Sequence, residues 1–129
     1  MNTNSKGRIA ELIAQAKYIN LGYNVLQPVH KDGVYDFVIE KDGDFQKVQA
    51  KVVNIKKDIY IIKNQKVSNG KTSYYEEGEF DLLVGVNIDT CEVFQIPFKE
   101  CTKGEVRLRK TPPKNNQKEK VKFYYDFKI

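Results

Sequence analysis

The sequence predicts an α/β (α+β) fold in which a mixed β-sheet is flanked by helices. Residues 4–22 have the apolar spacing of a helix, and from Tyr23 the pattern changes to the alternation that is typical of strands. The strands include a predicted hairpin and precede a smaller C-terminal element, which is the order expected of helices packed on a mixed sheet. The chain has 129 residues, 40% of them apolar and 30% charged, so we expect one folded domain.

The first helix is predicted from regularly spaced apolar residues near the N-terminus. Asn4 or Ser5 is expected to cap this helix, and Gly22 is well placed to end it. Glu11 lies at or near the edge of the apolar stripe, so its carboxylate either reaches over the sheet or pairs in solvent with a neighbouring Lys or Arg. The residues expected to form the buried stripe are Ile9, Leu12, Ile13, Ala16 and Ile19.

Extended segments are predicted along the rest of the chain. Residues 34–40 and 45–53 read as strands and flank an Asp42-Gly43 turn signal, which predicts a hairpin. A short helix is expected to begin at Pro97. Other strands are expected at residues 23–29, 59–63, 79–88, 91–97 and 105–110, polar loops at residues 64–77 and 111–120, and a return to apolar sequence at residues 121–127.

Charge varies strongly along the sequence. Residues 41–71 carry eight Lys or Arg against three Asp or Glu, and residues 99–129 carry ten against four. Between them, residues 72–98 carry six acidic residues and no Lys or Arg. Two basic segments that flank an acidic one are typical of a surface that attracts a polyanion such as nucleic acid, although a lysine-rich surface that serves only solubility has the same composition.

The N-terminal 20 residues lack the basic start and apolar block of a signal peptide. No apolar run in the chain approaches the length of a membrane span. We therefore expect a cytoplasmic (intracellular, not secreted) protein with no membrane partner.

A polar pair interrupts an otherwise apolar strand in KVQAK, residues 47–51. Side chains alternate along a strand, so Gln49 and Lys51 share one face, and the predicted hairpin brings Asp36 beside that face. A carboxylate in an apolar strand is unfavourable unless a charge or a metal ion compensates it. Lys51 can do so in a structural ion pair, and Mg²⁺, which prefers hard oxygen ligands, can do so as a bound ion.

Together with Glu11, these residues resemble the active site of the PD-(D/E)xK nuclease superfamily in its glutamine-bearing variant. More narrowly, the chain is similar to the small homing endonucleases of this superfamily that are encoded within group I introns. The resemblance runs from about residue 6 to residue 117, through KGRIAE, GYNVLQPV, YDFVIEKDGDFQKVQAK, YYEEGEFDLLVGVNIDTCEVFQIP and LRKTPPKNNQ. Tyr35 stands in place of the motif's proline, and Gln49 in place of its second acidic residue. The resemblance implies a restriction-endonuclease-like core in a single domain, residues 1–129.

The resemblance also implies an activity, that of a Mg²⁺-dependent, site-specific endodeoxyribonuclease, with Mn²⁺ as the alternative metal. It implies that Asp36, Glu11 and the backbone carbonyl of Ala50 bind the metal. Lys51 would orient the attacking water or stabilise charge on the scissile phosphate, and Gln49 would offer its amide oxygen or hold the water. Since a chain of this size has one such site, cutting both strands of double-stranded DNA implies a homo-oligomer, either a dimer or a tetramer.

DNA contacts are expected from the two basic segments. Lysines are expected to contact the phosphate backbone, and Arg, Asn and Gln, which offer paired hydrogen-bonding groups, to read base edges. For each of these residues the alternative is a solvated side chain. The candidates are Lys56, Lys57, Lys63, Lys66, Lys71, Arg107, Arg109, Lys110, Lys114, Asn115, Asn116 and Gln117.

Three other functions are compatible with the sequence. A restriction or junction-resolving nuclease of the same superfamily would have the same active site. A catalytically inactive DNA-binding module that kept the fold is compatible with Gln49 in place of a carboxylate. The third is an RNA-binding or protein-interaction domain in which Asp36 and Lys51 form only a structural ion pair.

Overall fold

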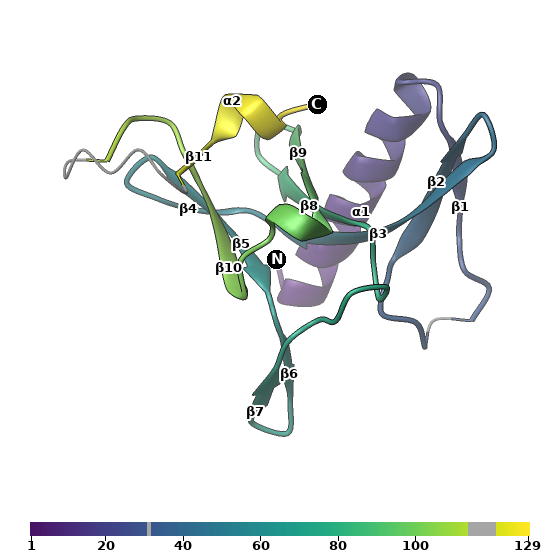
Figure 1. Ribbon diagram of the computed structural model, residues 1–129, viewed down its shortest axis with the longest axis horizontal. Helices are drawn as coiled ribbons and strands as arrows, with labels where there is room; N and C mark the ends of the chain where they lie inside the picture. Colours follow the sequence, from purple (N-terminus) through teal and green to yellow (C-terminus); the bar gives the residue numbers. More distant parts are fainter. Residues whose placement is uncertain (31, 114–120) are drawn as a thin grey trace.

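The computed structural model describes residues 1–30, 32–113 and 121–129. The strands of its central sheet are β1 (Asn24–Leu26), β2 (Phe37–Lys41), β3 (Asp44–Val52), β8 (Leu82–Asn87) and β9 (Glu92–Pro97). They are arranged in the order β1-β2-β3-β8-β9 (Figure 1). β3 and β8 are parallel, and the other neighbouring pairs are antiparallel. The predicted fold class, a mixed sheet with helices, and the predicted β2–β3 hairpin are confirmed.

A second sheet supplies the other wall of the core. Its strands are β4 (Asn54–Lys56), β5 (Ile59–Asn64), β10 (Gly104–Arg109) and β11 (Lys122–Phe123). They are arranged in the order β11-β10-β5-β4. β5 and β10 confirm two predicted strands, whereas β4 was not predicted, because its three residues are all exposed and carry no burial pattern.

A two-stranded hairpin stands apart from both sheets. Its strands, β6 (Lys66–Ser68) and β7 (Lys71–Ser73), pair with each other in a separate sheet. Asn69 and Gly70 connect them with φ angles of 51° and 76°, as a two-residue type I′ turn requires. The prediction that residues 64–77 form only a loop was therefore wrong, because the turn signal of Asn69-Gly70 is enough to close a polar hairpin.

The long helix α1 (Thr3–Asn20) covers one face of the central sheet (Figure 1). Its N-cap is Asn2, whose side chain accepts the N–H of Ser5 at 2.8 Å, so the predicted caps Asn4 and Ser5 lie inside the helix. Asn2 competes well for this position because its amide oxygen can reach the first free N–H groups. Gly22 follows the helix with a φ of 93°, which confirms the predicted end.

The buried face of α1 differs from the predicted stripe. Ala10, Ala14 and Tyr18 are fully buried against the sheet, whereas Leu12 and Ile19 are 48% and 61% exposed. The prediction was wrong for Leu12, Ala16 and Ile19, which are exposed, whereas Ile13 packs against the core as predicted. The helix holds a second set of residues at the same spacing, and this set is the one that is fully buried. The two alanines of this second set allow the helix backbone to approach the sheet closely.

Buried side chains lie on both faces of the central sheet. Val48 and Val84 face α1, and Leu83 faces the second sheet. At Gly85 the two sheets pack so closely that an added Cβ would lie 2.7 Å from a side-chain carbon of Ile62 on β5. The residues of the second sheet in this core are Tyr60, Ile62, Val106 and Leu108.

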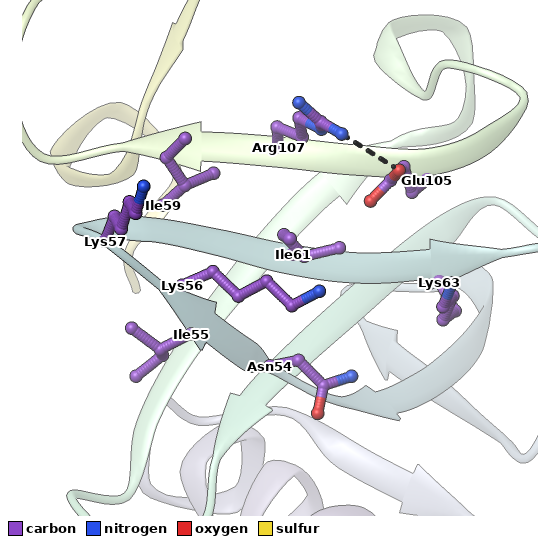
Figure 2. A pocket seen from close by; sticks show the side chains of 9 residues that line it. All are labelled: Asn54, Ile55, Lys56, Lys57, Ile59, Ile61, Lys63, Glu105 and Arg107. Atoms are coloured by element: carbon purple, nitrogen blue, oxygen red, sulfur yellow. Dashed lines mark hydrogen bonds and ion pairs between the residues drawn. The ribbon is translucent and has the colours of Figure 1, made fainter.

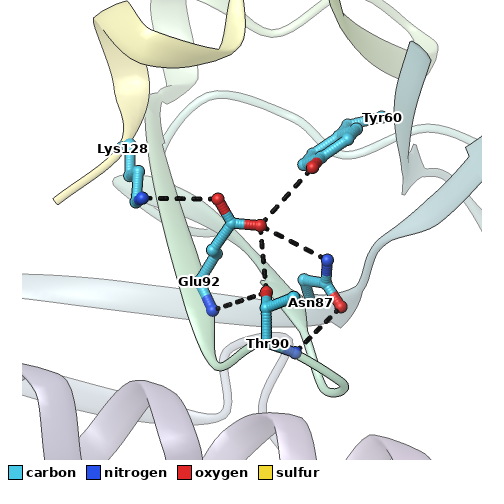
Figure 3. A network of polar contacts seen from close by, with 5 residues as sticks. All are labelled: Tyr60, Asn87, Thr90, Glu92 and Lys128. Atoms are coloured by element: carbon cyan, nitrogen blue, oxygen red, sulfur yellow. Dashed lines mark hydrogen bonds and ion pairs between the residues drawn. The ribbon is translucent and has the colours of Figure 1, made fainter. Parts of the chain in front are cut away.

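A polar network on Glu92 joins the C-terminal residues to the core (Figure 3). The chain turns through a short 3-10 helix, η1 (Phe98–Glu100), as predicted at Pro97, and ends in the four-residue helix α2 (Tyr124–Phe127). The Glu92 carboxylate accepts hydrogen bonds from Thr90 at 2.9 Å and Tyr60 at 3.4 Å, and Lys128 lies 3.3 Å from it.

No helix in the described part of the chain has the length and hydropathy to cross a membrane.

Glu92→Gln is expected to lower the free energy of unfolding by about 1 kcal/mol at pH 7. Burial alone would raise the pKa of Glu92, but hydrogen bonding by Thr90 and Lys128 brings this pKa below its ordinary value. A lowered folded-state pKa stabilises the fold above the unfolded-state pKa, and this stabilisation is lost as the pH falls through the folded-state pKa. The difference in free energy of unfolding between variant and wild type should therefore shrink on acidification.

Urea unfolding at pH 7 and pH 3 measures this difference, with the exposed Glu100→Gln as control. Equal midpoints at pH 7 would contradict the role of the network.

Candidate active site

The candidate active site forms where β2 and β3 diverge. Pairing between the two strands ends at Phe37 and Val48, while β3 continues to Val52. Asp36 directly precedes β2. Its N–H donates to the carbonyl of Val48 at 2.8 Å, and its carboxylate accepts the N–H of Ala50 at 2.8 Å. The carboxylate thus takes the place of a neighbouring strand and is fixed against the edge of β3.

Two further polar groups lie near Asp36 at this edge, the backbone carbonyl of Ala50 and the side-chain amide of Gln27. The N–H and C=O of one residue in an extended strand point to the same side, so the carbonyl of Ala50 faces the side on which its N–H meets Asp36. The amide nitrogen of Gln27 donates to the Asp36 carbonyl at 3.2 Å. Gln27 was not selected from the sequence, since a single amide after a short strand carries no signal.

Gln49 and Lys51 alternate with Ala50 along β3. Gln49 is only 8% exposed, and its amide oxygen has no hydrogen-bond donor among the described residues. A buried polar atom without a partner is unfavourable by about 1–3 kcal/mol. Lys51 is half-buried and forms no ion pair with a carboxylate in the described ranges.

Glu11 projects from α1 toward the same place. It follows the buried Ala10, its side chain is 18% exposed, and Arg8 lies 3.8 Å from its carboxylate. Glu11 thus pairs with an arginine but does not lie in solvent as the second alternative expected, and it lines a cavity of about 400 Å³. The residues that line this cavity are Thr3, Asn4, Gly7, Arg8, Glu11, Asp36, Gln49, Ala50, Lys51 and Val52.

The five residues selected from the sequence are thus brought together around one cavity. A second cavity, of about 140 Å³, also touches Glu11 and Asp36 and includes Tyr35, which stands at the position of the motif's proline. The two carboxylates therefore lie between two adjoining spaces.

The oxygen atoms around the larger cavity fit a hard divalent cation. Two carboxylates, the unpartnered amide oxygen of Gln49 and the carbonyl of Ala50 are all oxygen donors, which Mg²⁺ prefers. Among the described residues there is no group of three or more His, Cys, Asp or Glu arranged to hold a metal. This agrees with the presence of Gln49 where a third carboxylate would complete such a group.

A basic groove occupies the outer face of the second sheet. Its volume is about 610 Å³, and four of the predicted DNA-binding residues line it: Lys56, Lys57, Lys63 and Arg107. Figure 2 shows these side chains on three neighbouring segments, with Arg107 paired to Glu105 at 3.3 Å. Because residues directly opposite in antiparallel strands share a face, β4, β5 and β10 bring charges that are far apart in sequence onto one surface.

The other predicted DNA-binding residues lie elsewhere. Lys66 and Lys71 belong to the β6–β7 hairpin. Arg109 is on β10, and its guanidinium donates to the carbonyl of Thr111 at 3.2 Å. The ammonium of Lys110 lies 5.1 Å from the ring centroid of Tyr60, and its pKa is raised, first by a hydrogen bond with the Tyr60 hydroxyl. The remaining four candidates, Lys114, Asn115, Asn116 and Gln117, lie outside the described residues.

The fold and the cavity together define a nuclease of the restriction-endonuclease-like class. Two strands of the mixed sheet diverge, and a carboxylate from the helix lies beside the point of divergence. The chain belongs to the PD-(D/E)XK endonuclease family, whose family model matches residues 1–129. Membership makes it an enzyme that hydrolyses phosphodiester bonds, with DNA as its substrate.

Comparison with individual proteins supports this assignment. Over 81 residues the chain is 31% identical to Protein 5.3 of Escherichia phage T7, a match that covers 62% of this chain and 69% of the phage protein. Among solved structures, the bacterial homing endonuclease I-Ssp6803I matches with a TM-score of 0.81 over 99% of this chain and 89% of that one. The sequence identity of that match is 22%, so it is a similarity of fold.

Proposed function

We propose that this protein is a Mg²⁺-dependent, site-specific endodeoxyribonuclease whose active site is the cavity between α1 and the diverging strands β2 and β3. The observation that carries the proposal is that Glu11, Asp36, Gln49, Ala50 and Lys51 all line this cavity. They come from a helix, a loop and a strand, and four of the five, all except Ala50, are polar or charged residues outside the hydrophobic core.

Asp36, Glu11 and the carbonyl of Ala50 would hold the metal, which is Mg²⁺ or, alternatively, Mn²⁺. The metal would supply Lewis-acid stabilisation of charge on the phosphate. The N–H of Ala50 fixes one oxygen of Asp36 at 2.8 Å and so orients the carboxylate. Gln49 would offer its unpartnered oxygen as a neutral ligand or as an acceptor for the attacking water.

Lys51 is the residue we assign to the phosphate and the attacking water. Lys51 lines the same cavity, and its side chain forms no ion pair with a described carboxylate. A free ammonium group can orient the water by hydrogen bonds and stabilise the negative charge that develops on the scissile phosphate.

Homing is the biological role that we propose for this activity, with a restriction or junction-resolving role as the alternative. Support comes from the fold similarity to a bacterial homing endonuclease. We assign one such cavity to the described part of the chain, so cutting both strands of DNA would require two copies, in a dimer or a tetramer. Action on intracellular DNA agrees with the cytoplasmic location expected from the sequence, and an intron around the gene would favour homing.

A second candidate function is a DNA-binding module without catalysis. The observation that favours it is Gln49, because an amide replaces the carboxylate that the motif places at this position. Such a module would bind DNA with the same salt dependence and leave it uncut.

Metal removal tests the proposal. Wild-type protein is incubated with a library of supercoiled plasmids that carry random inserts, in Mg²⁺, in Mn²⁺ or in EDTA. We expect linear products cut at one preferred sequence in either metal and intact plasmid in EDTA, because the two carboxylates need a cation to bring the phosphate close. Binding without cutting in Mg²⁺ would favour the inactive module. DNA affinity that does not fall as salt increases would contradict any DNA function.

A further inference from the structure

The β6–β7 hairpin extends away from the two larger sheets (Figure 1). All residues from Val67 to Ser73 are exposed, and Val67 itself is 65% exposed. A two-stranded hairpin is marginally stable at best on its own, and this one buries little apolar surface in return for being ordered. The hairpin therefore suits contact with a partner better than it suits support of the fold.

The chemistry of the hairpin fits a polyanion. Residues 66–73 contain two lysines, Lys66 and Lys71, and no Asp or Glu. Ser68 pairs directly with Lys71 beside the turn, so a hydroxyl and an ammonium group share one face at the tip. The amide of Asn69 stands at the turn itself, and amides and lysines are among the groups that recognise the edges of adenine and guanine.

The base of the hairpin is anchored to the core. The ammonium of Lys66 lies 3.4 Å from the carboxylate of Glu79 and 5.2 Å from the ring centroid of Tyr75. The Tyr75 ring packs edge-on against the buried Phe80, with 5.1 Å between ring centroids. These contacts hold the base in place while the tip remains accessible.

Residues 75–81, which include the residues that anchor the hairpin, also lie beside the candidate active site. The Asp81 N–H donates to the carbonyl of Lys47 on β3, and the Asp81 carboxylate accepts the Lys47 N–H at 2.8 Å, next to Val48, whose carbonyl accepts the N–H of Asp36. In agreement with this position, burial raises the pKa of the Tyr75 hydroxyl, and the charges of Asp36 and Glu79 raise it further. The hairpin therefore starts from the neighbourhood of Asp36.

We propose that the β6–β7 hairpin enters the major groove of DNA and reads bases beside the cleavage position through Asn69 and Lys71. The major groove, about 12 Å wide, admits a two-stranded β-ribbon. This inference rests on the proposed function and deepens it, because it names the element that gives the nuclease its sequence preference.

The test is a binding selection from a library of random-sequence DNA duplexes in Ca²⁺, with sequencing of the bound fraction. Asn69→Gly removes the amide and keeps a residue that tolerates the positive φ, and Lys71→Ala removes the ammonium. The matched controls are Asp42→Gly, at the corresponding position of the β2–β3 turn with a φ of 53°, and Lys99→Ala, which removes an exposed lysine outside the hairpin. Thermal unfolding of each variant checks the fold.

We expect both hairpin variants to lose base preference by about 10-fold at neighbouring positions of the selected sequence, and the controls to keep the wild-type preference. A uniform loss of affinity in Lys71→Ala, with a smaller salt dependence and unchanged base preference, would mean that Lys71 contacts phosphate only and would overturn the inference. Unchanged preferences in both variants, or no preference in wild type, would overturn it too. Selection by the hairpin without cleavage in Mg²⁺ would support the inference while contradicting the proposed nuclease.

Discussion

Asp36→Asn should reduce the rate of Mg²⁺-dependent DNA cleavage by about 1,000-fold or more. Asparagine keeps an oxygen for the N–H of Ala50 but lacks the negative charge that holds a divalent cation. Loss of Lewis-acid stabilisation is worth several kcal/mol, and each 1.36 kcal/mol changes a rate about tenfold. Single-turnover cleavage with protein in excess measures the effect without interference from product release.

Two further variants separate chemistry from folding. Asp32→Asn removes an exposed carboxylate four residues earlier and should cleave at the wild-type rate. Asp36→Ala should lose cleavage and also unfold more easily, by about 1–3 kcal/mol, because it leaves the N–H of Ala50 without its acceptor. Wild-type cleavage by Asp36→Asn would contradict the assignment of the site.

The convergence of Asp36, Gln49 and Ala50 in the candidate site was predictable from the sequence, because these three residues are placed by strand alternation and by one local turn. Asp42-Gly43 fixes the hairpin, the hairpin fixes the register of β2 against β3, and the register puts Asp36 beside Gln49 and Ala50. Each of these steps involves neighbours in sequence. The hydrogen bond from the Gln27 side chain was not predictable, since it depends on how the loop after β1 folds back.

The error in the helix stripe has a physical cause that sequence periodicity cannot resolve. Leu12 and Ile19 are more hydrophobic than Ala10 and Ala14, so a pattern based on hydrophobicity selects the former pair. The sheet selects the latter pair because small residues permit close packing, and this rotation brings Glu11 to the cavity. The same rotation that made the predicted stripe wrong therefore supports the predicted site residue.

The basic surface was only partly predictable, because charge along a chain does not define a face. Pairing of β5 with β4 and β10 gathers Lys56, Lys63 and Arg107 into one groove. Lys110 follows β10 but lies over the rings of Tyr60 and Tyr124, on the side of the C-terminal residues. Which lysines meet at a surface depends on strand register between distant segments, and the sequence alone does not state that register.

Lys51→Met should reduce the cleavage rate by about 100- to 1,000-fold while leaving DNA affinity close to that of wild type. Methionine keeps most of the length of the side chain and removes the charge, so the loss reports the interaction with the phosphate and the water. Removal of one donor aimed at developing charge has effects of this size in other hydrolytic sites. Single-turnover cleavage and a binding titration in Ca²⁺ measure the two quantities separately.

Lys47→Met is the matched control, because Lys47 precedes Lys51 by two strand repeats and faces the same way. Its ammonium donates to the carbonyl of Gly78 and lies 5.9 Å from the ring centroid of Tyr35, so we expect Lys47→Met to lower stability more than cleavage. Lys51 has no described ionic partner, so Lys51→Met should unfold at the wild-type denaturant concentration or above it. A Lys51→Met protein that unfolds at a lower denaturant concentration than wild type and still cleaves DNA would show that Lys51 supports the fold. Cleavage would then not depend on the ammonium group of Lys51, the only lysine among the described residues that line the glutamine-bearing cavity.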